Sequence, residues 1–198
     1  MRKVALIIIG IGVSLLSFYI VYNVLNDQKE KESIETYIEE TSIVEEINEI
    51  QNIVEPVKEE KKAVIDYKAI LEIPIINLKE GLVEVTENFK SLNYAVSIDS
   101  VSNYPSEYGN FILYAHSGRS NISFFKNLNK VNINDNVYIY YSGYKYTYKI
   151  YDKYEIEKTG TMEITIPKNN KIITLLTCVS GTNKQVVLIG NQIKEEMY

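Results

Sequence analysis

The chain of 198 residues is 45% hydrophobic and 24% charged, with a net charge of −5, one cysteine, one histidine and no tryptophan. This hydrophobic fraction is enough for a packed core, so global disorder is excluded. A lone cysteine excludes an internal disulfide, and it makes a zinc site hard to build, because such a site takes several cysteine or histidine ligands. The acidic balance argues against nucleic acid as a partner.

The amino-terminal residues predict a membrane anchor. Arg2 and Lys3 precede an apolar run over residues 4–25. At about 1.5 Å per residue, this run is long enough to cross a hydrocarbon core of about 30 Å. The charges before the run place the amino terminus in the cytoplasm and the remaining chain outside the cell. A cleaved signal peptide is the alternative, but the run is long for one. We therefore expect residues 1–26 to form a cytoplasmic tail and a retained, single-pass transmembrane helix in the cell membrane.

Residues 27–62 differ in composition from the rest of the chain. They contain twelve acidic residues and five lysines, a net charge of −7, whereas residues 63–198 contain fourteen of each sign. Apolar residues keep a loose helical spacing up to Pro56, which should end any helix. We interpret the segment as a solvated, helical stalk that holds the next domain off the membrane. A partner-binding or coiled-coil helix is the alternative.

The predicted domain, residues 63–198, is rich in Ile, Val and Tyr segments that are separated by turn residues, a pattern typical of strands. Ser142-Gly143 between two such segments indicates a hairpin. A short helix is expected around Ile122 to Leu128. The expected strands cover residues 70–78 with a break at Pro74, then 110–115, 137–141, 144–151, 172–176 and 186–189. This pattern predicts a mainly β fold, a closed or nearly closed barrel of seven to eight strands.

The only histidine and the only cysteine each follow a predicted strand. His116 comes after residues 110–115, and Cys178 comes after residues 172–176. Strand ends often carry reactive side chains, because the strand fixes the backbone and the loop gives access. A lone cysteine, however, is more often inert core packing. The spacing alone leaves open whether the two side chains meet.

The sequence around these two residues resembles the sortases, membrane-anchored cysteine transpeptidases of Gram-positive bacteria. Thr174-Leu175-Leu176-Thr177-Cys178 matches the Thr-Leu-x-Thr-Cys signature of that family, and Ala115-His116 fits its histidine context. The resemblance covers roughly residues 65–193. It implies a sortase-like barrel whose partners are surface proteins with a carboxy-terminal sorting signal, the cell membrane, and a peptidoglycan precursor or another amine acceptor.

The resemblance also implies the roles of particular residues. Cys178 would attack the Thr–Gly carbonyl of a motif similar to Leu-Pro-x-Thr-Gly, and His116 would transfer the protons. The residues expected to bind substrate are Thr177, Ala115, Ser117 and Arg119. No cofactor is expected. Calcium binds some relatives, but Asp99, Glu107 and Glu163 form no clear carboxylate cluster in the sequence.

One position departs from the family pattern. Sortases have an arginine near the start of the strand after the cysteine, and here that position falls on Lys184 or Gln185. Lysine keeps the charge without the planar fork, and glutamine keeps a donor that can serve an oxyanion hole. Arg119 could fold across the cleft instead. A reduced activity is therefore one expectation, and the alternatives are another extracellular cysteine hydrolase and a non-catalytic binding module on a sortase fold.

The subclass is only partly indicated. Residues 151–170 leave little room for a long helical insertion before the cysteine strand, and no Asp-Pro-Trp lid precedes the domain. These features favour a single-anchor housekeeping or specialised sortase over a haem-acquisition or pilus-polymerising type.

Overall fold

The computed structural model describes residues 65–159 and 161–198, together with the helical residues 19–22, 24, 25, 28, 31 and 34–36. Most of the expected membrane anchor and most of the expected stalk therefore lie outside the described residues. Among those that are described, no helix is long and apolar enough to cross a bilayer. The anchor and the stalk stay predictions.

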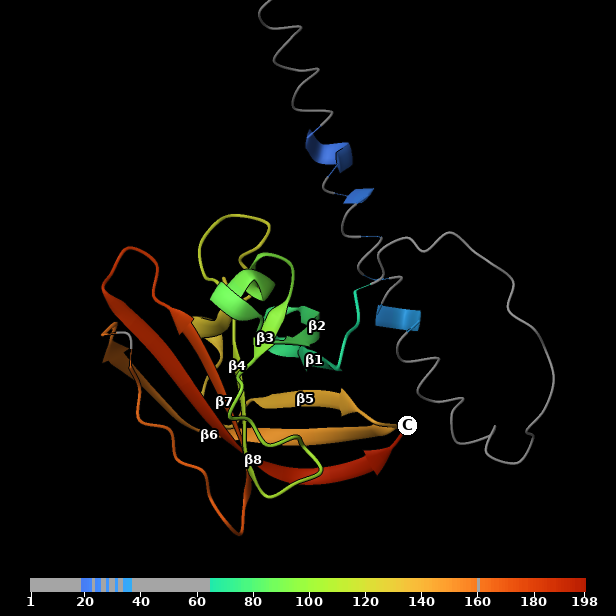
Figure 1. The fold of residues 1–198 in the computed structure, drawn as a ribbon, viewed down its shortest axis with the longest axis vertical. Helices are drawn as coiled ribbons and strands as arrows, with labels where there is room; N and C mark the ends of the chain where they lie inside the picture. Colours follow the sequence, from blue (N-terminus) through green and yellow to red (C-terminus); the bar gives the residue numbers. More distant parts are fainter. Residues whose placement is uncertain are drawn as a thin grey trace, which may run out of the picture.

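Eight strands close into a barrel in the order β1-β2-β3-β4-β7-β8-β6-β5, which confirms the expected mainly β barrel (Figure 1). Three short 3₁₀ helices, η2, η3 and η4, interrupt the strands. The strands are β1 Ala69–Ile73, β2 Leu78–Glu84, β3 Val96–Ile98, β4 Gly109–Tyr114, β5 Asn136–Tyr141, β6 Tyr144–Glu157, β7 Lys171–Cys178 and β8 Lys184–Met197, and the 3₁₀ helices are η2 Pro74–Ile76, η3 Glu87–Asn93 and η4 Leu128–Lys130.

The hairpin between β5 and β6 forms as its turn residues predict. Ser142 and Gly143 both have left-handed backbones, with φ of 51° and 78°, and they connect the paired residues Tyr141 and Tyr144. Two successive left-handed residues make a turn that matches the right-handed twist of the strands. Along β6, Tyr146, Tyr148 and Ile150 are all buried in the barrel core, and Thr147 between them is 6% exposed.

The expected helix over residues 122–128 is wrong. The chain makes a series of turns there, and only Leu128–Lys130 forms a 3₁₀ helix. The Phe125 N–H bonds to the His116 carbonyl at 3.0 Å, and the Phe125 side chain is 1% exposed. Because the Phe125 N–H is bonded to the carbonyl nine residues earlier, and its side chain fills the core, the helical bond to the residue four positions back does not form. The last strand is also much longer than residues 186–189, since β8 pairs with both β6 and β7.

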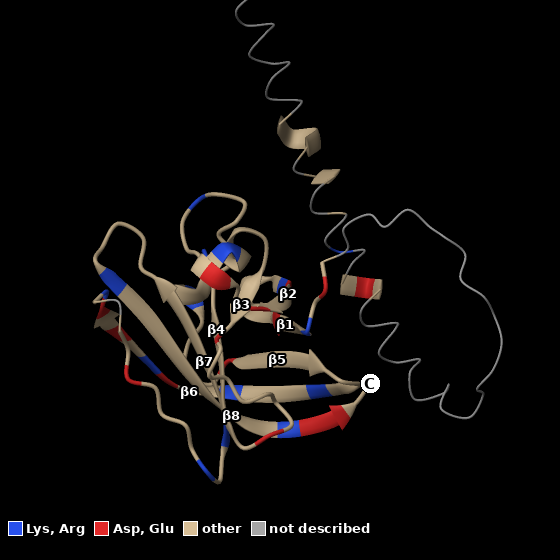
Figure 2. Cartoon of the chain, in the orientation of Figure 1, with Lys and Arg blue, Asp and Glu red and all other residues tan. Residues whose placement is uncertain are grey.

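The hydrophobic residues form two separate clusters. The larger one fills the barrel interior. The smaller one, called the outer cluster below, consists of Ile34, Tyr67, Ile70, Val83 and Ala95. Along β1 the neighbours of Ile70 belong to the interior, so Ile70 itself points outward. Lys, Arg, Asp and Glu are interspersed over the barrel rather than gathered by sign (Figure 2).

Candidate active site at the ends of β4 and β7

Two parallel neighbouring strands deliver the histidine and the cysteine. The last pair in the register of β4 with β7 is Tyr114 with Leu176. Beyond it, the Thr177 hydroxyl donates a buried hydrogen bond of 2.7 Å to the Ala115 carbonyl. The residues that follow, His116 and Cys178, therefore occupy matching positions after these two neighbouring strands. Because Ala115 and Thr177 are buried in the barrel wall, alternation turns the next two side chains outward.

The backbone on each side of this pair is fixed by short hydrogen bonds. The His116 carbonyl accepts the Phe125 N–H at 3.0 Å, which closes the loop after β4. After Cys178, the Val179 N–H bonds to the Lys184 carbonyl at 2.8 Å, and the Thr182 hydroxyl donates to the Val179 carbonyl at 3.0 Å. The histidine is exposed and the cysteine is half-buried. Both side chains can therefore meet a substrate from solvent.

The two residues that could replace the missing arginine point to opposite faces of the sheet. Gln185 is the direct partner of Cys178 in the antiparallel pair of β7 with β8, so their side chains share one face of the sheet. Lys184 is adjacent in the chain and points to the other face. Its Nζ lies 3.2 Å from the Glu155 carboxylate, and both side chains are about half exposed. Gln185 is thus the amide donor placed beside the cysteine.

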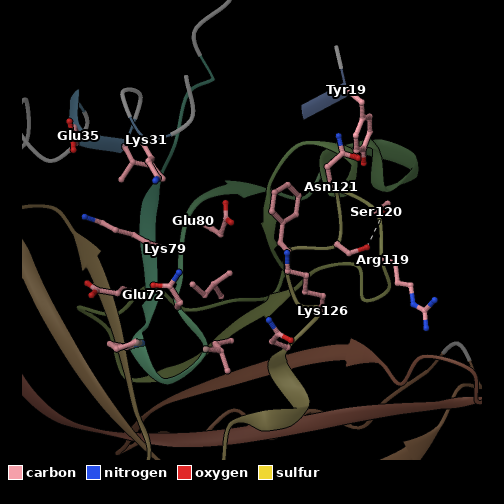
Figure 3. Close-up of a pocket in the computed structure, with 18 residues that line it drawn as sticks. Tyr19, Lys31, Glu35, Glu72, Lys79, Glu80, Arg119, Ser120, Asn121 and Lys126 are labelled. Atoms are coloured by element: carbon pink, nitrogen blue, oxygen red, sulfur yellow. Dashed lines mark hydrogen bonds between the residues drawn. The ribbon is translucent and has the colours of Figure 1, made fainter. Parts of the chain in front are cut away.

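The other residues that the sequence singled out lie around this pair. Ser117 is half-exposed directly after the histidine, and the hydroxyl of Thr177 is directed to the Ala115 carbonyl. Arg119 is exposed and borders a cavity of about 830 Å³, whose lining includes neither the histidine nor the cysteine (Figure 3). In that view its guanidinium extends away from Glu72 and Glu80. This cavity is therefore separate from the candidate active site.

Sequence reasoning missed an aromatic pair beside the site. Tyr114 lies two residues before His116 and so shares its outward face. Phe89 of η3 meets the Tyr114 ring edge-on at 6.2 Å and is 60% exposed, with a left-handed φ of 56°. Burial, and then the charge of Asp99, raises the pKa of Tyr114 to about 12. The position of Tyr114 could have been found from its spacing to the histidine, but nothing local in the sequence indicates the contact with Phe89.

The carboxylates considered for calcium do not gather. In the described part of the chain, no group of three or more His, Cys, Asp or Glu side chains is arranged to hold a metal ion. Asp99 instead accepts the backbone N–H of Val101 at 3.0 Å, as turn aspartates commonly do.

Comparison with known proteins agrees with this arrangement. The sortase domain model matches residues 71–192, which is more than half of the chain. The structure of a Clostridium perfringens sortase D5 transpeptidase is similar at 19% identity and a TM-score of 0.64, over 83% of this chain and 98% of that one. Listeria monocytogenes sortase A is similar at 23% identity and a TM-score of 0.59, over 67% and 90% of the two chains. Streptococcus agalactiae sortase C1 is similar at 23% identity and a TM-score of 0.59, over 66% of this chain and 70% of that one. No curated protein matches the sequence.

A closed eight-stranded barrel with a cysteine and a histidine at the ends of parallel neighbouring strands defines a sortase-type fold. The chain belongs to the sortase family, whose members are cysteine transpeptidases.

Proposed function

We propose that the protein is an anchored transpeptidase that cleaves a sorting motif similar to Leu-Pro-x-Thr-Gly and joins the threonine to an amine. The observation that carries the proposal is the matching position of His116 and Cys178, which is set by the β4–β7 register and by the Thr177–Ala115 hydrogen bond. The predicted anchor would keep the enzyme in the cell membrane with the barrel outside. The partners are surface proteins with a sorting signal and a peptidoglycan precursor or similar amine.

The first half of the reaction forms a thioester. The Cys178 thiolate attacks the carbonyl carbon between threonine and glycine, and the oxyanion that develops needs a hydrogen-bond donor. The Gln185 amide, on the same sheet face, supplies that donor. His116 gives a proton to the departing glycine nitrogen, and the carbon–nitrogen bond breaks.

The second half transfers the acyl group. The incoming amine loses a proton to His116 and attacks the thioester carbonyl, so that the new amide forms as the carbon–sulfur bond breaks. The thiolate is then regenerated. Transfer rather than hydrolysis requires the amine to react faster than water.

A peptide assay tests this function. The full chain in detergent is given a quenched fluorescent Leu-Pro-x-Thr-Gly peptide with and without a glycine-based amine, and products are identified by mass spectrometry. The parent should cleave between threonine and glycine and form the amine adduct, while Cys178→Ala and His116→Ala should form neither. Cleavage that survives in Cys178→Ala would exclude the proposed nucleophile.

The same variants decide between an enzyme and a binding module. A catalytic Cys178 should react quickly with a thiol probe at neutral pH, and His116→Ala should slow that reaction, because a nearby imidazolium favours the thiolate. Slow labelling that is unchanged in His116→Ala, together with no cleavage, would instead support a non-catalytic module.

A further inference from the structure

A side chain from the segment before the barrel is buried against the barrel wall. Ile34 is 3% exposed and packs in the outer cluster with Tyr67, Ile70, Val83 and Ala95. Its neighbours Glu35 and Thr36 are exposed. The contact is therefore one-sided, as when one face of a helix lies on a surface.

The chain comes back to the same place where the barrel begins. Ile65 is partly buried against the outer cluster, and Tyr67 is 5% exposed within it. The Tyr67 ring occupies the space over Gly81 that any Cβ at that position would need. Ile34 and Ile65, which precede and follow residues 37–64 in the sequence, thus pack on the same cluster. Residues 37–64 carry eight acidic residues and three lysines.

The same segment borders the cavity described above. Figure 3 shows Tyr19 beside Asn121 at one end, and Lys31 and Lys79 at the other. Lys31, Ile34 and Glu35 thus line this cavity together with residues of β1 and β2, next to the place where Ile34 is buried.

We propose that Ile34 docks the amino-terminal segment on the outer cluster, so that the residues before Ile34, and not residues 37–64, set the distance between the predicted membrane span and the barrel. Only residues 26–33 then separate the predicted membrane span from the docked point. These eight residues reach about 12 Å as a helix and at most about 28 Å when extended. A spacer made of residues 26–62 would instead allow more than about 100 Å. The docked barrel therefore stays close to the membrane.

Crosslinking tests the contact in the full chain. The sole cysteine is first removed as Cys178→Ala, which makes the result independent of whether the enzyme is active. Ile34→Cys is then combined with Val83→Cys in protein reconstituted into lipid vesicles, and mild oxidation is followed on a non-reducing gel. The matched control combines Thr36→Cys with Val83→Cys, because Thr36 is exposed two residues further on. Most of the first variant should form the disulfide and little of the control should; equal yields would overturn the proposal.

A second pair of variants needs no crosslink. Ile34→Asp should lower the melting temperature of the full chain, because a carboxylate at a buried apolar position costs stability. Glu35→Asp keeps a carboxylate at the neighbouring exposed position and should not lower it. Replacing residues 40–60 by about ten Gly and Ser residues, which span about 17 Å on average, should leave the crosslink yield unchanged. Loss of the crosslink on this shortening, or a melting temperature that Ile34→Asp does not alter, would show that the segment is not docked.

Discussion

Replacing Gln185 should show whether its amide acts as the oxyanion donor or only stabilises the strand. Gln185→Ala removes the amide that shares a sheet face with Cys178. Side chains opposite each other in an antiparallel pair have Cβ atoms about 5 Å apart, so this amide can reach an oxygen on a carbon bonded to the sulfur. Removing one oxyanion donor costs about 10²–10³ in kcat. We expect this loss in kcat, with little change in KM.

The neighbouring lysine provides the matched control. Lys184→Ala breaks only a half-exposed ion pair with Glu155, which is worth about 0–1 kcal/mol, so activity should stay close to the parent. Gln185→Glu keeps the shape without an N–H and should lose at least as much activity as Gln185→Ala. Gln185→Arg restores the residue typical of the family and should retain activity.

Steady-state cleavage of the quenched peptide measures these variants, with circular dichroism to confirm that each is folded. The reasoning fails if Gln185→Ala cleaves as fast as the parent. In that case Gln185 is an ordinary strand residue, and Arg119→Ala becomes the variant that identifies the donor.

Three further predictions concern the barrel. Thr177→Val removes a buried hydrogen bond and should cost about 1–3 kcal/mol, seen as a melting temperature several degrees lower, together with a lower kcat. An unchanged melting temperature would contradict this, and Thr161→Val at an exposed position is the control. Burial raises the pKa of Tyr146 to about 12 and that of Tyr148 further, so stability present below the unfolded value of about 10 should be lost as the pH rises through 12. A circular dichroism spectrum that stays unchanged above pH 12 would argue against this. The buried hydroxyl of Tyr114 has no hydrogen-bond partner among the described residues, so Tyr114→Phe should leave the melting temperature unchanged or raise it, and a clear fall would reveal a partner.

The sequence predicts the barrel better than it predicts the site. The Ser142-Gly143 turn depends on local geometry, and the hairpin that it predicts is confirmed. The helix expected at residues 122–128 does not form, because the Phe125 N–H bonds to the His116 carbonyl, a contact that no local pattern encodes. The two strand ends that carry the site could be named from their motifs, but their matching positions depend on a parallel register between segments about sixty residues apart. The choice of Gln185 over Lys184 likewise needed the pairing of β7 with β8.

The parallel pairing of β4 with β7 bears on when the protein acquires its reactivity. Contacts between segments so distant in the chain form late in folding, because the entropy of closing the long loop between them must be lost first. A newly synthesised, still unfolded chain therefore has no imidazole held beside its thiol. Under the proposed function, the cysteine becomes a nucleophile only when the barrel closes.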